Sequence, residues 1–295
     1  MDKLIITVTC DSSMSYPDNP YCQNIENVKW FAEEYIRAVN AGASICHVHG
    51  VHYLEDEIQP DGRKLSKIDH DGWQELHDRI KEKVNPIMQY GIASARMDDK
   101  IKLMDQKPDM MSYAFNAHDE WFQPDPNKPP KEIYALHPRD ELRTFLRACN
   151  EKGVKPEVEC FHMGAFYNLR ALREEGMFTD PVWTTLFFWP GGTWTPPTTK
   201  ALVNFVDHLP PNCNYNVSVM DYNPNVNWQL LTQVIILGGH VRVGFEDNPF
   251  LSPGEYATTN AQLVEKVVRI AREVGREIAS PDEAREIIGL KPKKQ

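Results

Sequence analysis

The feature that most constrains the fold is a regular alternation of short apolar runs with longer amphipathic segments, from one end of the chain to the other. Each apolar run has the length and composition of a buried strand. Eight such runs are present: Leu4–Thr9, Ser44–Val48, Ile87–Tyr90, Met110–Phe115, Lys155–Cys160, Thr184–Phe188, Asn214–Val219 and His240–Phe245. Eight strand–helix units close into a barrel. We therefore predict an α/β protein in which residues 1–295 form a single (β/α)8 TIM barrel.

The segments between the runs carry apolar residues at helical spacing. Three of these stripes stop just before a glycine: residues 25–39 before Gly42, 142–149 before Gly153 and 261–271 before Gly275. Glycine after the last periodic residue is a common helix stop. An open doubly wound sheet is the alternative, but it would place a GxGxxG loop after the first strand, where the sequence reads "TVTCDSSMSYP".

Composition argues against several classes of partner. The 42 acidic residues exceed the 32 basic ones, giving a net charge of -10, and no basic stripe could follow a nucleic acid. The six cysteines are scattered without CxxC pairs, and there is no run of 18 apolar residues. We expect a cytoplasmic protein that binds neither nucleic acid nor membrane.

The stretch "ASICHVHG" ends a strand with two histidines. Side chains two residues apart on a strand share a face, so His47 and His49 can bind one metal ion. A third ligand is expected from Glu246 or Asp247 in "GGHVRVGFEDN", because the second and eighth strands both flank the first. Two imidazoles and a carboxylate are a common catalytic zinc set. His52 and His240 are alternative ligands, and a hydrogen-bonded pair without metal is the alternative role.

Several stretches together resemble the β-keto acid cleavage enzyme family: "AGASICHVHG", "GVKPEVECF", "GGHVRVGFEDNPF" and "NAQLVEKVVRIAREVGREIASPDEAREII". The resemblance covers essentially the whole chain. It implies a zinc-dependent catalytic barrel that converts a β-keto acid and acetyl-CoA into acetoacetate and a new acyl-CoA.

The resemblance also implies roles for individual residues. By position, His47, His49 and Glu246 bind zinc, Asp247 is the acid/base group, and Arg242 is its electrostatic partner and orients the substrate. Glu159 aligns with a carboxylate near the Arg242–Asp247 pair. Its alternative role is to balance a basic side chain inside the barrel.

The predicted substrate-binding residues are Met14, Gly91, Ala114 and Asn116. Met14, Gly91 and Ala114 stand where members that act on an amino-substituted keto acid have an acidic residue, a serine and a threonine. The surrounding loops offer thioether and aromatic surface instead: Met14, Tyr16, Tyr90, Phe115, Trp121 and Phe122. We therefore predict a neutral apolar β-keto acid of about five to eight carbons. Dehydrocarnitine, held by cation–π contact, is the alternative substrate.

The loop "WPGGTW" is the predicted entrance for acetyl-CoA, through Pro190, Gly191 and Gly192; a simple turn is its alternative role. Trp121 and Trp194 are expected on the surface and favour a homo-oligomer, a dimer or tetramer. Another metal-dependent barrel aldolase or hydrolase is the first alternative function. A non-catalytic ligand-binding barrel is the second.

Overall fold

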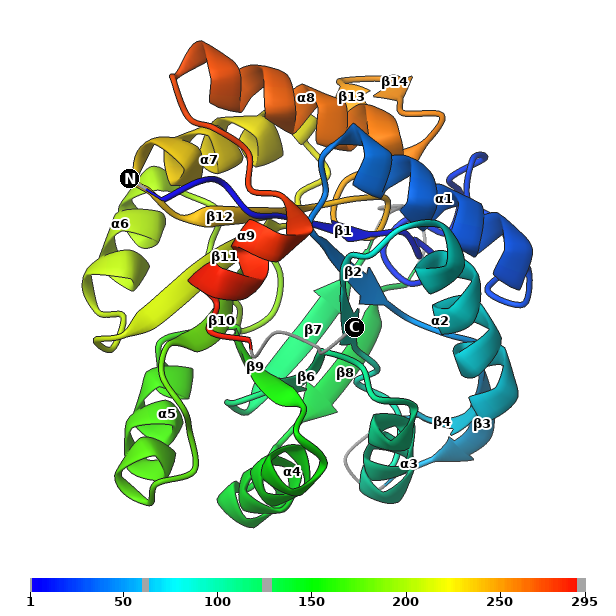
Figure 1. The fold of residues 1–295 in the computed structure, drawn as a ribbon, viewed down its shortest axis with the longest axis vertical. Coiled ribbons are helices and arrows are strands. Elements are labelled where there is room, and N and C mark those ends of the chain that lie inside the picture. Colours follow the sequence, from blue (N-terminus) through cyan, green and yellow to red (C-terminus); the bar gives the residue numbers. More distant parts are fainter. Residues whose placement is uncertain (1, 60–63, 124–128, 291–295) are drawn as a thin grey trace.

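A computed structural model describes residues 2–59, 64–123 and 129–290. Within them, eight parallel strands form a closed barrel in the order β1-β12-β11-β10-β9-β6-β5-β2 (Figure 1). The barrel strands are β1 (Ile6–Thr9), β2 (Ile45–Val48), β5 (Ile87–Tyr90), β6 (Met110–Ala114), β9 (Lys155–Cys160), β10 (Val182–Phe188), β11 (Cys213–Val219) and β12 (His240–Val243). Each of them overlaps one predicted run, so the predicted (β/α)8 barrel is confirmed.

Helices surround the barrel and follow its strands. They are α1 (Val28–Ala41), α2 (His70–Lys83), α3 (Met97–Leu103), α4 (Arg139–Lys152), α5 (Gly164–Glu174), α6 (Thr199–Asp207), α7 (Pro224–Ile236), α8 (Asn260–Glu273) and α9 (Pro281–Ile287). Helices α1, α4 and α8 coincide with the predicted stripes; Gly42 and Gly153 directly follow the first two with positive φ angles of 126° and 68°. None of the helices in the described ranges is long and apolar enough to span a bilayer.

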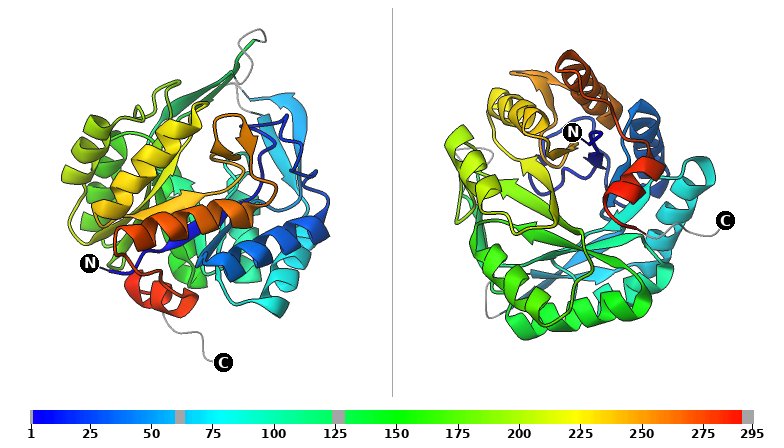
Figure 2. Two further views of the ribbon diagram at one scale, coloured as in Figure 1. Left: turned by 90° about the horizontal axis from the view of Figure 1, so that it is seen from above. Right: turned by 60° about the vertical axis from the view of Figure 1, so that its left-hand side comes forward.

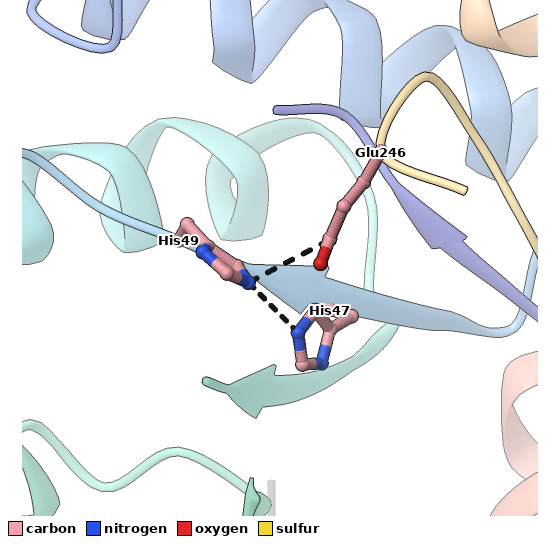
Figure 3. A group of neighbouring side chains, drawn as sticks. All are labelled: His47, His49 and Glu246. Carbon is pink, nitrogen blue, oxygen red and sulfur yellow. Dashed lines mark hydrogen bonds and ion pairs between the residues drawn. The ribbon is translucent and has the colours of Figure 1, made fainter. Parts of the chain in front are cut away.

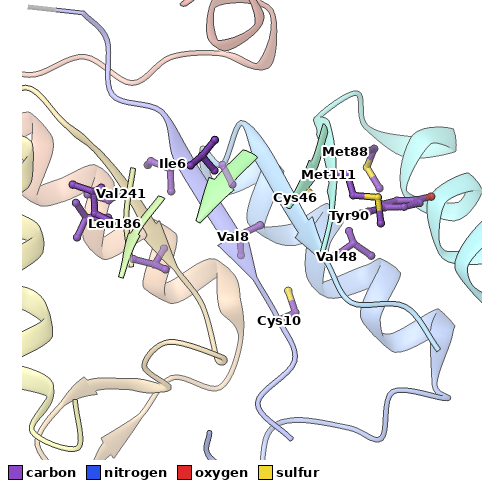
Figure 4. Packing of buried hydrophobic residues seen from close by; sticks show 14 of the residues in the cluster. Ile6, Val8, Cys10, Cys46, Val48, Met88, Tyr90, Met111, Leu186 and Val241 are labelled. Atoms are coloured by element: carbon purple, nitrogen blue, oxygen red, sulfur yellow. The ribbon is translucent and has the colours of Figure 1, made fainter. Parts of the chain in front are cut away.

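The outward faces of the barrel strands form the main hydrophobic core with the helices. Alternate side chains point outward, as Ile6 and Val8 of β1 and Val48 of β2 do, and all three are completely buried (Figure 4). The intervening residues point into the barrel, where most side chains near its centre and mouth are polar. Because of this alternation, one short strand contributes apolar side chains to the helix-facing core and polar side chains to the barrel interior.

The N-terminal end of the barrel is closed by an apolar plug. One buried cluster joins Ala284 within α9 and Ile288 just after it to five side chains at this end of the barrel: Ile5, Ile45, Ile87, Met110 and Trp183. Helix α9 lies across this end of the barrel (Figure 1). The plug separates the polar barrel interior from solvent on this side, so ligands have access from the other end.

Three antiparallel hairpins extend the loops at that other end (Figure 2, left). They are β3 (His52–Ile58) with β4 (Lys64–Ile68), β7 (His118–Phe122) with β8 (Lys131–Ala135), and β13 (Phe250–Ser252) with β14 (Glu255–Tyr256). None was predicted, because these strands are short, largely solvent-exposed and lack an alternating apolar pattern.

The plug generates a prediction about stability. Ile288→Ala should lower the free energy of unfolding by about 2–5 kcal/mol, because it leaves a cavity where a fully buried side chain stood. Ile236→Ala, at the end of α7, is the matched control, since Ile236 is 53% exposed. Urea unfolding of the two variants measures the difference. Equal losses would show that α9 does not seal the barrel.

Candidate active site

His47 and His49 converge at the C-terminal end of β2. His47 is the third residue of the strand and is buried, whereas His49 follows the strand end and is partly exposed. Their Nε2 atoms lie 3.0 Å apart (Figure 3). Burial, and then the positive charge of Arg242, hold the pKa of His47 well below its usual range, so this imidazole is neutral. A neutral imidazole offers a lone pair.

Glu246 reaches the two histidines from the turn after β12. Its Oε2 atom lies 3.6 Å from His49 Nε2 (Figure 3) and accepts a hydrogen bond from the Thr9 hydroxyl. Burial opposes its ionisation, but the charge of Arg242 outweighs burial and lowers the pKa of Glu246 to about 2. Glu246 is therefore an anionic oxygen donor at neutral pH.

These three side chains have the arrangement of a metal-binding set. One potential ligand atom from each of His47, His49 and Glu246 lies within 4.8 Å of the others. Two ligand nitrogens at about 2.0–2.1 Å from a tetrahedral zinc ion would lie roughly 3.3 Å apart, close to the 3.0 Å between the imidazoles. The donor atoms thus fit one divalent ion without rearrangement of the barrel.

Arg242 and Asp247 form a buried ion pair beside this set. Arg242 projects inward from β12, and its Nε and Nη2 atoms donate to the two Asp247 oxygens at 3.0 and 2.9 Å. Its Nη2 atom is also 2.8 Å from Glu246 Oε1. Burial raises the pKa of Asp247 to about 7 against the opposing charge of Arg242, and the charge of Glu246 adds to the rise. Asp247 can therefore exchange a proton near neutral pH.

Two further carboxylates project into the barrel from β9. Glu157 is completely buried and accepts hydrogen bonds from the Ser112 and Thr185 hydroxyls. Glu159 lies two residues nearer the mouth. Burial, and then the charge of Glu157, raise the pKa of Glu159 to about 8, so it is mainly protonated at neutral pH.

A model of the beta-keto acid cleavage enzyme family matches residues 4–290 of this chain. The chain belongs to this family. The family resemblance noted in the sequence is therefore confirmed, as is the expectation of an enzyme that cleaves β-keto acids.

Individual relatives agree with the family assignment. A 3-keto-5-aminohexanoate cleavage enzyme of Fusobacterium nucleatum is 31% identical over 296 residues, 99% of each chain. One of Acetoanaerobium sticklandii is 32% identical over 299 residues, 98% of this chain and 99% of its own. A 3-dehydrocarnitine:acetyl-CoA trimethylamine transferase of Rhizobium meliloti is 34% identical over 150 residues, 50% of this chain and 48% of its own.

Among solved structures, the apo structure of ObcA resembles this chain in fold. Its TM-score is 0.68 at 18% sequence identity, over 89% of this chain and 64% of ObcA. At this identity the likeness supports the barrel and carries no statement about chemistry.

The predicted substrate-binding residues of this family member occupy different surroundings. Met14 is 38% exposed in the loop after β1, next to Ser15, whose hydroxyl donates to the Glu246 carbonyl. Ala114 lies in a buried aromatic cluster at the end of β6. Asn116 is buried, and its Oδ1 accepts from the Phe161 backbone at 3.1 Å, so it links the ends of β6 and β9.

Gly91 lies directly against a candidate metal ligand. A Cβ atom at this position would overlap the His47 ring and stand 2.7 Å from its Nε2. In this structure the packing of the His47 ring therefore leaves no room for a side chain at position 91.

The predicted acetyl-CoA loop packs against β7. Trp189 Nε1 donates to the Trp121 carbonyl at 3.1 Å. A Cβ on Gly191 would stand 2.7 Å from the same carbonyl, and one on Gly192 would overlap the Asp119 carbonyl. These glycines allow the close approach of two loops, and Pro190 is exposed beside them.

Several side chains lie elsewhere than the sequence suggested. Tyr90 and Phe115 do not line a pocket, because both are completely buried in the core between barrel and helices. Trp194 is not a surface residue: it is 7% exposed and packs on Phe161 at a ring distance of 4.5 Å. Trp121 is exposed as expected. The side chain of Phe122 lies outside the described part of the structure.

The alternative metal ligands take structural roles. His240 lies at the opposite end of β12, where its Nδ1 accepts from the Ile5 backbone at 3.0 Å and its ring stacks on Trp183. His52 Nδ1 lies 2.8 Å from the Gly50 carbonyl. Neither is part of the set around Glu246.

Three polar residues of the site were not identified from the sequence: Thr9, Gln89 and Glu157. The available signal was a polar residue at an inward position of an otherwise apolar strand. In the parallel registers, Thr9 pairs with His47 and His47 pairs with Gln89, so both lie beside a histidine that had been identified.

The contact at Gly91 generates a prediction. Gly91→Ala should displace the His47 ring and lower the affinity for zinc by about tenfold or more, the usual scale for disturbing the support of a ligand. Competition with a chromophoric chelator measures the affinity. Ala93→Ser is the control, because this exposed residue lies on the same loop. Unchanged affinity in a folded Gly91→Ala protein would contradict the placement of His47.

Proposed function

We propose that this chain is a zinc-dependent β-keto acid:acetyl-CoA acyltransferase, which converts a β-keto acid and acetyl-CoA into acetoacetate and an acyl-CoA. The observation that carries the proposal is the convergence of His47, His49 and Glu246 beside the buried Arg242–Asp247 pair, in a chain that belongs to the β-keto acid cleavage enzyme family. The whole chain, residues 1–295, acts as one catalytic barrel domain.

His47, His49 and Glu246 hold the metal. Zinc is favoured because two neutral imidazoles and a carboxylate suit it better than magnesium, which prefers oxygen ligands and water. When bound, the ion supplies a Lewis acid that polarises the ketone and carboxylate oxygens of the substrate.

Asp247 exchanges the proton on the α-carbon of the β-keto acid. The ketone and carboxylate on either side acidify this C–H bond, and a carboxylate with a pKa of about 7 can remove and return its proton. The α-carbon then attacks the acetyl carbonyl carbon, and the thioester C–S bond breaks to release CoA thiolate. The thiolate adds to the original acyl carbon, whose bond to the α-carbon breaks, and the α-carbon takes back its proton. The first fragment leaves as acetoacetate and the second as acyl-CoA.

Arg242 and Glu159 control the charge around that step. Arg242 fixes both Asp247 oxygens through its bidentate hydrogen bonds. Glu159 retains its proton at neutral pH and presents a neutral hydrogen-bond donor to the mouth of the barrel. A protonated Glu159 does not repel the substrate carboxylate.

The substrate is proposed to be a neutral, apolar β-keto acid. Met14, Gly91 and Ala114 offer no side-chain carboxylate for an ammonium group, and a desolvated unpaired charge costs several kcal/mol. The buried cluster of Ala114, Phe161, Phe187 and Met220 supports an apolar wall. Dehydrocarnitine is the alternative substrate. A relative that matches half of this chain is named for it, and aromatic rings can bind a quaternary ammonium group by cation–π contact.

Further parts of the proposal concern the surroundings of the enzyme. Pro190, Gly191 and Gly192 border the acetyl-CoA entrance, next to the exposed Trp121. All six cysteines are unpaired, which suits a cytoplasmic enzyme. Trp121 is also a candidate contact of a homo-oligomer, a dimer or tetramer.

The proposed reaction is tested with a panel of β-keto acids and acetyl-CoA, with acetoacetate and acyl-CoA measured by mass spectrometry. A neutral β-keto acid of about five to eight carbons should be consumed before 3-keto-5-aminohexanoate or dehydrocarnitine when all compete in one reaction. Preference for either of the two substrates that carry an ammonium group would contradict the proposed apolar character of the substrate pocket. Turnover without acetyl-CoA would instead indicate an aldolase or hydrolase.

Substitution by the corresponding amide distinguishes the roles of Asp247 and Glu159. Asp247→Asn should lower kcat by about 10² or more, because it removes the proton acceptor. Glu159→Gln should change kcat by less than about tenfold at pH 7, because the amide resembles a carboxyl group that is protonated there.

The pH dependence gives a second measurement for the same pair. Above pH 8 wild-type Glu159 loses its proton while the Gln variant cannot, so the two rate profiles should separate only on the alkaline side. Near-normal kcat in Asp247→Asn would remove Asp247 from the mechanism. Parallel pH–rate profiles would contradict the proposal that turnover depends on a protonated Glu159.

A further inference from the structure

Gln89 contacts His47 from the neighbouring strand β5. It is the third residue of β5, is completely buried, and pairs with His47 in the parallel register of β2 and β5. Its Oε1 atom lies 2.9 Å from His47 Nδ1. The other ring nitrogen, Nε2, faces His49. The His47 imidazole therefore joins the candidate metal-binding set to a buried amide on the neighbouring strand.

We propose that Gln89 is a positioning residue that fixes the proton of His47 on Nδ1 and leaves the Nε2 lone pair directed at the metal position. An amide oxygen only accepts hydrogen bonds, so Nδ1 must be the donor in this contact. A neutral imidazole carries one proton, so Nε2 is then unprotonated. The inference rests on the proposed metal site, and it assigns a residue outside the ligand set to it.

The surroundings of Gln89 determine which way its amide points. In the reverse orientation the amide NH2 would donate to Nδ1, the ring proton would move to Nε2, and the lone pair needed by a metal would be lost. Glu157 opposes this reversal, because its carboxylate lies near Gln89 and would then face the amide oxygen. Gln89 Nε2 is buried and has no hydrogen-bond partner among the described residues, and Gln89 lowers the pKa of the nearby Glu157 carboxyl, which is the direction expected when the NH2 group and not the amide oxygen faces it.

Glu157 is itself fixed in place. The Ser112 hydroxyl donates to its Oε2 and the Thr185 hydroxyl to its Oε1, so residues of β6 and β10 hold the carboxylate inside the barrel. The amide that contacts His47 thus has a fixed carboxyl group as its neighbour. Such outer partners usually change metal affinity by about 10–100-fold when they are removed.

The tautomer of His47 is tested directly with 15N-histidine-labelled, metal-free full-length protein, in which NMR shows which ring nitrogen carries the proton. His47→Ala assigns the signal. Wild type should carry the proton on Nδ1. Gln89→Met, which has similar volume but no amide, should lose this preference, and its zinc affinity by chelator competition should fall by about 10–100-fold. Gln229→Met, on the exposed face of α7, is the matched control and should change neither.

Each outcome bears on the proposal. A wild-type proton on Nε2, or a folded Gln89→Met protein with unchanged tautomer and zinc affinity, would overturn it. Loss of stability in metal-free Gln89→Met, with the Nδ1 proton retained, would indicate a merely structural role and overturn it as well. If Gln89→Met shifts the tautomer but wild type binds no zinc, the positioning by Gln89 stands and the zinc site of the proposed function fails.

Discussion

The closure of the barrel between β1 and β12 is the constraint on which the site depends. Immediately after β12, Gly244 adopts a φ angle of 142°, and a Cβ there would overlap the Thr9 backbone. The chain can therefore turn tightly over the end of β1. Strands β12 and β2 lie on opposite sides of β1. The turn after β12 brings the Glu246 carboxylate across β1, where it contacts the Thr9 hydroxyl and lies near His49, which follows β2. A side chain at position 244 would separate the carboxylate from the histidines.

The buried guanidinium of Arg242 is the second element that the site needs. A charge that is only 1% exposed is stable only if its hydrogen-bond donors are paired. Asp247 and Glu246 supply that pairing from consecutive positions of one turn. The same contacts leave the two carboxylates with different properties, since Glu246 is held ionised while Asp247 titrates near neutral pH. Neighbouring residues can thus serve as ligand and as acid/base group.

The sequence predicted those features that depend on local pattern. Each barrel strand overlaps one of the short runs predicted from the sequence, and strand geometry and barrel closure predicted that the histidines after β2 and the acidic residues after β12 lie close together. Residues inside the barrel were harder to predict, because Gln89 and Glu157 read as isolated polar residues. Only the register places Gln89 beside His47, and only the closed barrel brings Glu157 within the electrostatic influence of Arg242. Tyr90 and Phe115 were misplaced for a related reason: a one-residue change of position on a strand moves a side chain from the interior to the helix-facing core.

The balance of charge explains why these polar groups are compatible with one another inside the barrel. Four carboxylates, Glu157, Glu159, Glu246 and Asp247, surround Arg242, and in a medium of low dielectric constant they cannot all be ionised together. The pKa of Glu159, raised to about 8, removes one negative charge at neutral pH, burial disfavours the charge of Glu157 as well, and Arg242 compensates another through its ion pair with Asp247. Glu246 is held ionised and faces the two histidines. Its negative charge therefore favours a cation at the position where ligand atoms of His47, His49 and Glu246 already converge.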